Sequence, residues 1–172
     1  MRLILIASLF VFASSASAQD VPRKYALTEF NNEGCLAKGA VQNCASTNPV
    51  MRQILADGKD AIPILISQLA ETSRAKLEIV DYWGDTRSGD VAFIVLTDLF
   101  ADEDGHSFLP PGVPGWDTIM KSCEYSASGC WVVYLRKHGR KSVQDQWQQA
   151  WGRHKNEITW DASGHHFRVS KP

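Results

Sequence analysis

The sequence predicts a mainly α-helical protein with one small β-hairpin near its C-terminus. Apolar residues recur at the three- and four-residue spacing of helices across most of the chain, most clearly in residues 60–100. Gly, Pro and Ser separate short periodic segments, which favours six or seven helices over a few long ones. Near the C-terminus, apolar residues alternate on both sides of an Asp-Ala-Ser-Gly turn, a pattern typical of a hairpin.

The first 18 residues have the pattern of a secretory signal peptide. Arg2 gives a positive start, residues 3–13 are almost wholly apolar, and Ala16 to Ala18 supply small residues for cleavage after Ala18. The apolar run is well short of the roughly 20 residues that a bilayer-spanning helix needs. We therefore expect a secreted or periplasmic protein with no membrane insertion after signal cleavage.

The mature chain has the size of one domain. Removing 18 residues from 172 leaves 154, residues 19–172, which is enough for one hydrophobic core. Without Arg2 the chain carries 17 Lys and Arg against 19 Asp and Glu, a net charge of −2 with neutral histidines. This balance excludes the basic footprint of a nucleic-acid partner and the polybasic patch of a membrane-binding protein.

The four cysteines, Cys35, Cys44, Cys123 and Cys130, are an even number in an exported chain, so disulfides are expected. Three connectivities are possible, and we favour the local pairs Cys35–Cys44 and Cys123–Cys130. A bridge needs Cα atoms within about 7 Å, so each local pair implies a turn between its cysteines. Neither pair has the CxxC spacing of a zinc site.

The first clear helix covers residues 49–57. Asn48 can cap it, Pro49 suits its first position, and Gly58 provides a left-handed stop. Upstream, residues 19–33 are polar and weakly periodic, so we expect a loose N-terminus with at most one helical turn over residues 25–30.

Two buried helices dominate the middle of the chain. The first runs from Asp60, its expected N-cap, to Ala70, and Pro63 is tolerated there because it lies in the first turn. The second covers residues 88–100. The connection between them, residues 71–89, is longer than most helix–helix connections, and long connections often carry binding function.

The last third of the chain continues the helical pattern. Helical stripes are expected over residues 116–123 and 131–138, with a break at residues 126–129 and a stop at Gly139. Ser142 and Asp145 resemble a capping box and predict the start of a last helix. The hairpin then follows in residues 157–169.

Residues 60–69, Asp-Ala-Ile-Pro-Ile-Leu-Ile-Ser-Gln-Leu, and residues 90–99, Asp-Val-Ala-Phe-Ile-Val-Leu-Thr-Asp-Leu, together resemble one unit of a HEAT-like repeat. The resemblance covers about forty residues. It implies a helical hairpin that binds a protein or ligand and performs no chemistry. The chain departs from the family in its long connection and in lacking a second copy at a fixed period, whereas a solenoid needs several units.

No motif in the sequence carries chemistry. Around Gly105 the acidic cluster fails as a calcium loop, because Phe100 and Pro111 occupy the first and twelfth positions. A Gly-x-Ser-x-Gly elbow and a phosphate-binding glycine loop are both absent.

Adjacent His165 and His166 on a strand would point to opposite faces, which argues against a shared zinc site. One of them could pair with Asp161 or His154 around zinc, but the pattern favours a surface histidine pair. No metal or cofactor is therefore expected.

Five of the six tryptophans lie in the last third of the chain. Exposed, they would suit a carbohydrate- or peptide-binding platform; buried, they would anchor a small core. Trp147 and Trp151 are four residues apart on an apolar stripe, which favours the core. Trp83, beside Tyr82 in the long connection, is the best candidate for an exposed aromatic residue.

These observations favour a non-catalytic module that binds another protein or a small ligand. Its expected surface is residues 82–88 and the loop 102–115. The candidate binding residues are Tyr82, Trp83, Asp102, Asp104 and His106.

Two other classes remain open. One is a small secreted hydrolase with its acid or metal ligands among Asp98, Asp104, His106, His165 and His166. The other is a periplasmic inhibitor or immunity-type protein, which fits the size and the export signal equally well. An enzyme would need at least two of the hydrolase candidates to converge in a pocket.

Overall fold

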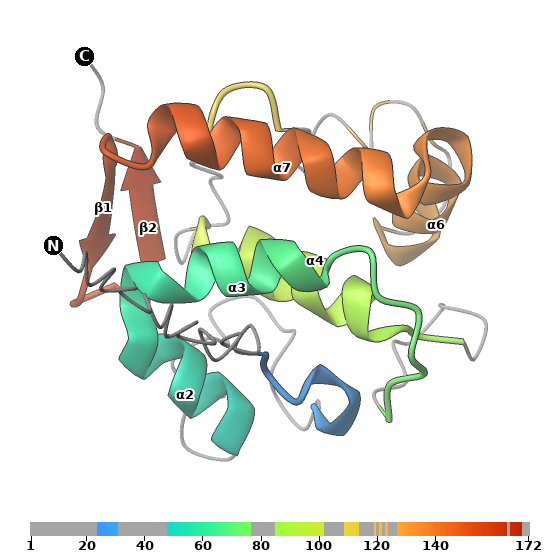
Figure 1. Cartoon of the computed structure of the whole chain (residues 1–172), viewed down its shortest axis with the longest axis horizontal. Coiled ribbons are helices and arrows are strands. Elements are labelled where there is room, and N and C mark those ends of the chain that lie inside the picture. The colour runs from blue at the N-terminus through green and yellow to red at the C-terminus, as the bar shows by residue number, and fades with distance from the viewer. Residues whose placement is uncertain are drawn as a thin grey trace, which may run out of the picture.

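In the computed structural model, residues 24–30, 48–76, 85–101, 109–113, 119, 121, 123, 127–164 and 166–169 are described. This part of the chain is mainly helical, with a small antiparallel hairpin at its C-terminal end, as the sequence predicts (Figure 1). It contains five α-helices where six or seven were expected: α2 (Pro49–Asp57), α3 (Ala61–Gln68), α4 (Ser88–Leu99), α6 (Ala127–His138) and α7 (Arg140–His154).

Helix α2 begins and ends where its local chemistry predicts. The Asn48 carboxamide oxygen accepts hydrogen bonds from the backbone N–H groups of Val50 at 2.9 Å and Met51 at 3.1 Å. Pro49 follows at the first helical position, where no intrahelical partner for its nitrogen is lost. Gly58 ends the helix with a φ of +53°, a conformation that costs glycine little. The prediction for this helix is confirmed.

The start of α3 differs from the expected cap. A 3₁₀ turn, η2 (Gly58–Asp60), runs directly into the helix, and Asp60 has helical φ and ψ with no side-chain capping bond. Because the chain enters α3 already coiled, the first turn needs no separate N-cap. Pro63 still lies in that turn, as predicted.

Helix α4 lies at the centre of the described fold, and α3 packs against it (Figure 1). Every residue of α4 except Asp98 is buried, so this helix is covered on all sides instead of presenting one stripe. Its first turn approaches the end of α3 very closely. The Gly89 N–H donates to the Glu71 carbonyl at 3.2 Å, and a Cβ at Gly89 would stand 2.3 Å from the Leu69 carbonyl oxygen.

Residues 24–30 contain the one helical turn that the sequence allows there, but they are packed into the core, which corrects the expectation of a loose segment. They contain a 3₁₀ turn, η1 (Leu27–Glu29), and they bury the side chains of Tyr25, Leu27 and Phe30. The buried Gln68 carboxamide accepts from the Tyr25 N–H and donates to the Tyr25 carbonyl, both at 2.9 Å. The Tyr25 hydroxyl donates to Asp57 at 2.6 Å. These partners are distant in sequence, so local periodicity could not reveal them.

Helices α6 and α7 meet at a sharp corner. Gly139, with a φ of +79°, ends α6 as predicted. However, α6 begins at Ala127 and continues through Gly129, where a break was expected. Helix α7 begins at Arg140, two residues before the expected start at Ser142, and no side-chain capping bond forms at its N-terminus.

The predicted disulfide between Cys123 and Cys130 is present, with Cα atoms 5.5 Å apart. Cys130 is buried in the first turns of α6, and Cys123 is half-buried before that helix. The bridge therefore ties the start of α6 to the segment that precedes it. The proposed partners Cys35 and Cys44 lie outside the described residues, and their pairing remains a prediction.

The C-terminal hairpin is confirmed. Strands β1 (Ile158–Asp161) and β2 (His166–Val169) are antiparallel and pair Ile158 with Val169 and Trp160 with Phe167. Phe167 is fully buried, β2 packs on α4, and β1 packs on η2. The Lys59 ammonium donates to the Ile158 carbonyl at 2.6 Å and so fastens β1 to η2.

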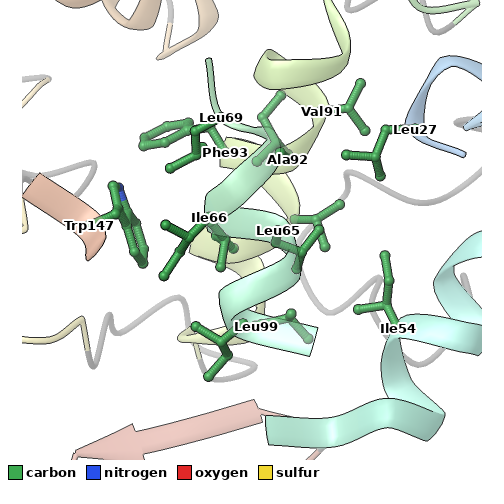
Figure 2. Close-up of a cluster of buried hydrophobic side chains, with 14 of the residues drawn as sticks. Leu27, Ile54, Leu65, Ile66, Leu69, Val91, Ala92, Phe93, Leu99 and Trp147 are labelled. Carbon is green, nitrogen blue, oxygen red and sulfur yellow. The ribbon is translucent and has the colours of Figure 1, made fainter. Parts of the chain in front are cut away.

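The hydrophobic core lies between α3, α4 and α7, with residues 24–30 closing one side. Figure 2 shows Leu65 and Ile66 of α3, and Leu69 directly after it, among the buried side chains, with Trp147 of α7 beside Ile66. Trp131 and Trp147 are each 1 % exposed, so the expectation that tryptophans anchor the core is confirmed for these two. Trp131 stacks on Phe93 with ring centroids 3.5 Å apart.

Candidate functional site

The binding residues predicted from the sequence, Tyr82, Trp83, Asp102, Asp104 and His106, all lie outside the described residues. Their role therefore remains a prediction. Asp104, His106 and His165 of the alternative hydrolase set lie outside as well. Asp98 and His166 are the two members of that set that the structure describes.

Asp98 lies in the last turn of α4 and keeps some contact with solvent. Loss of water around its carboxyl group raises its pKa from 3.8 to about 7. A carboxyl group with such a pKa can exchange protons near neutral pH. No hydrogen bond or ion pair joins this carboxyl group to another described acid or histidine, so Asp98 and His166 are not brought together as a catalytic pair.

His166 has a structural role in the hairpin. Its ring is buried, Nδ1 lies 3.0 Å from the Gly164 carbonyl oxygen, and Nε2 lies 2.8 Å from Nε of Arg168. Because the guanidinium can only donate, Nε2 accepts, and the proton is on Nδ1, which donates to the carbonyl. Both nitrogens are thus engaged within the hairpin, and neither is open to a substrate.

Asp161 shapes the turn between the two strands. Its Oδ1 accepts from the Ser163 hydroxyl at 2.6 Å, the Ser163 N–H at 3.0 Å and the Gly164 N–H at 3.2 Å. These hydrogen bonds, the one from the Ser163 hydroxyl first, lower the pKa of Asp161 to about 2. The acid that the sequence placed near the histidines therefore stabilises the turn.

The strongest buried electrostatic feature is the carboxylate of Asp90, which is 0 % exposed. Arg140 Nη1 lies 2.6 Å from its Oδ1, the Trp131 indole N–H donates to the same oxygen at 3.1 Å, and the Arg87 N–H donates to Oδ2 at 2.8 Å. A buried charge needs such partners. Since the carboxylate has no solvent access, this network joins α4, α6 and α7 and does not form a ligand site.

Described residues of α3 and α7 line a groove that could take a small ligand. Its volume is about 280 Å³, just below the roughly 300–1,000 Å³ of most small-ligand sites. The two helices pack against each other, with α7 above α3 in Figure 1. None of its lining residues carries a charge; they are Pro63, Ile66, Ser67, Gln144, Gln148 and Trp151.

Gln144 links the two helices and also faces the groove. Its Nε2 donates to the carbonyls of Ile66 at 3.0 Å and Ser67 at 2.6 Å, which lie at the C-terminal end of α3. The nitrogen position is fixed because both partners are acceptors. The side chain is 9 % exposed, and no described donor reaches its Oε1. Gln144 thus holds an oriented acceptor at the groove.

The other groove residues offer complementary contacts. Gln148 is exposed, one helical turn beyond Gln144, and its amide can both donate and accept. The half-buried indole of Trp151 lies a further turn along α7, with the Lys59 ammonium 5.9 Å from its ring centroid. That cation–π contact, together with the Lys59 hydrogen bond to Ile158, helps hold the indole in place.

Sequence reasoning missed this groove. The sequence pattern places Trp151 on the core stripe with Trp147, and the indole does pack partly against the core, but the pattern gives the glutamines no role. The available signal was the spacing of Gln144, Gln148 and Trp151 at i, i+4 and i+7, which places them on one face of a helix. Their relation to α3 depends on tertiary packing, so the sequence pattern alone could not place them in a groove.

No known protein family, curated protein or solved structure matches this chain. Among the described residues, no helix is long and apolar enough to cross a membrane. The same residues contain no group of three or more His, Cys, Asp or Glu side chains that could hold a metal ion. A functional argument therefore depends on the geometry of the groove.

Proposed function

We propose that this chain is an exported, non-catalytic binding module and that the groove between α3 and α7 is its ligand surface. The observation that carries the proposal is the uncharged lining of this groove, in which the oriented Gln144 acceptor lies on the same helix face as Gln148 and Trp151. Concave sites that combine apolar side chains with a few placed polar groups are typical of ligand binding.

Two further features support binding and export. The Cys123–Cys130 disulfide suits an oxidising compartment, in agreement with the signal-peptide pattern of residues 1–18. The HEAT-like resemblance of residues 60–100 also points to binding. The described residues contain no group of three or more His, Cys, Asp or Glu side chains that could hold a metal ion.

The chemistry of the lining indicates an uncharged ligand. A charged group would have to lose water without gaining an opposite charge from the six lining residues. An uncharged ligand with donors and acceptors can use Gln144, Gln148 and the Ser67 hydroxyl oxygen, while an apolar edge packs on Trp151 and Pro63. We therefore propose a neutral ligand with both hydrogen-bonding and apolar parts.

The test is an affinity capture with mature oxidised protein from the native envelope or culture fraction. The groove variant is Gln148→Ala, and Gln149→Ala is the matched control because Gln149 is an exposed glutamine on α7 that does not line the groove. We expect a ligand or partner that the wild type and the Gln149→Ala protein retain and the Gln148→Ala protein loses. Equal capture by all three proteins would place the ligand surface elsewhere.

A further inference from the structure

The two glutamines of the groove have a spacing that suits hydrogen bonds to an extended polypeptide backbone. Gln144 and Gln148 are four residues apart on α7, about 6 Å along the helix axis at 1.5 Å per residue. An extended peptide presents backbone groups to the same edge at every second residue, about 6.7 Å apart at 3.3–3.4 Å per residue. The two repeats match closely enough for neighbouring glutamines to meet alternate residues of one strand.

The hydrogen-bonding capacity of each glutamine fits this arrangement. The Gln144 amide nitrogen is committed to the Ile66 and Ser67 carbonyls, so its remaining function is to accept from a ligand N–H through Oε1. Gln148 is hydrogen-bonded to no described residue and can accept from one backbone N–H while donating to the adjacent C=O. Together they offer two acceptors and one donor along one edge.

The ends and walls of the groove favour a short neutral segment. Pro63 and Trp151 provide apolar surface for a small or apolar side chain, and the lining is uncharged. The volume of about 280 Å³ limits the occupant to a short stretch of chain. The Gln144 acceptor also favours an occupant with an N–H donor, because an occupant without one leaves this oxygen unpaired and binds more weakly.

We propose that the groove between α3 and α7 binds a short, uncharged, extended peptide segment of a partner protein through backbone hydrogen bonds to Gln144 and Gln148. This inference rests on the proposed function and specifies its ligand class. Side-chain preference should be weak except for small or apolar residues that face Trp151 and Pro63.

The experiment is a selection of random peptides on mature oxidised protein, followed by affinity measurement with fluorescein-labelled peptides. A selected peptide should bind the Gln148→Ala protein at least tenfold more weakly, because the variant loses two hydrogen bonds and one alone is worth about 1.4 kcal/mol. It should bind the Gln149→Ala control as it binds the wild type. N-methylation at two alternate backbone amides should each weaken binding about tenfold. Methylation of the amide between them should have little effect.

A panel of neutral oligosaccharides tested in parallel separates the two proposals. If a sugar binds in a manner that depends on Gln148 and no peptide does, the peptide inference is overturned while the groove keeps its binding role. If peptides bind through the groove but N-methylation shows no alternation, extended-backbone recognition is overturned. If neither peptides nor sugars show binding that depends on Gln148, both proposals fail. Circular dichroism spectra of the variants establish that each one is folded.

Discussion

Two buried tryptophans provide a sharp test of which polar contacts stabilise this fold. Trp131 and Trp147 are each 1 % exposed, but their indole N–H groups have different surroundings. The Trp131 N–H donates to the buried Asp90 carboxylate at 3.1 Å. The Trp147 N–H is buried and has no hydrogen-bond partner among the described residues. Replacing each tryptophan by phenylalanine therefore removes the same atoms from two different electrostatic environments.

The expected magnitudes follow from these surroundings. Trp131→Phe loses a hydrogen bond to a charged acceptor, worth about 1.5–3 kcal/mol, in addition to ring volume. Trp147→Phe loses similar volume but also removes an unsatisfied donor, which recovers about 1–3 kcal/mol of desolvation cost. We expect Trp131→Phe to lower the free energy of unfolding by about 2.5 kcal/mol or more beyond the effect of Trp147→Phe.

The assay is urea unfolding of the oxidised variants, followed by far-ultraviolet circular dichroism because tryptophan fluorescence changes in both variants. A difference of this size corresponds to a gap of about 5 °C or more in Tm for a chain of this length. The Asp90→Asn variant serves as a second probe of the network and should be destabilised as Trp131→Phe is. A larger loss in Trp147→Phe than in Trp131→Phe would refute the reasoning.

Three further predictions concern other parts of the fold. Gly89→Ala should lower the free energy of unfolding by about 3 kcal/mol or more, because its Cβ would meet the Leu69 carbonyl oxygen at 2.3 Å. Gly152→Ala is the control: nothing lies within 4 Å of its Cβ on exposed α7, so it should be neutral or stabilising in the same urea assay. Asp98 has a pKa raised to about 7, so the folded state binds more protons than the unfolded state between about pH 4 and 7. The free energy of unfolding should therefore fall as the pH rises through that range. Asp98→Asn should flatten this pH dependence, and an unchanged slope would contradict the assignment. Replacing Cys123 and Cys130 together by alanine should lower the free energy of unfolding by about 2–3 kcal/mol. Equal stability of this variant and the oxidised wild type in the urea assay would contradict the prediction.

Local chemistry was enough to predict several elements. Asn48, Pro49 and Gly58 are adjacent to the helix that they delimit, so α2 could be placed from its own residues. The turn at Asp161 likewise places the hairpin, and its register follows from alternation on each side. The Cys123–Cys130 pair needed no more than a turn between two nearby cysteines.

Elements that depend on distant partners could not be predicted. Residues 24–30 are ordered by Gln68, which is 43 residues from Tyr25 in sequence. Arg140 at the start of α7 pairs with buried Asp90 of α4, so the ion pair favours an earlier start than the one that the local Ser142 pattern suggests. Gln144 reaches α3 across 77 residues, and that contact creates the groove. A candidate site built by tertiary packing leaves no local pattern to find.

The most direct test of the central claim is a nuclear magnetic resonance titration of ¹⁵N-labelled mature protein with the tightest selected peptide. If the α3–α7 groove is the ligand surface, the side-chain amide signals of Gln144 and Gln148 and the indole signal of Trp151 will shift together with one common Kd. The indole signal of buried Trp131 will stay in place. Largest shifts on other surfaces, with these three signals unmoved, would contradict the account.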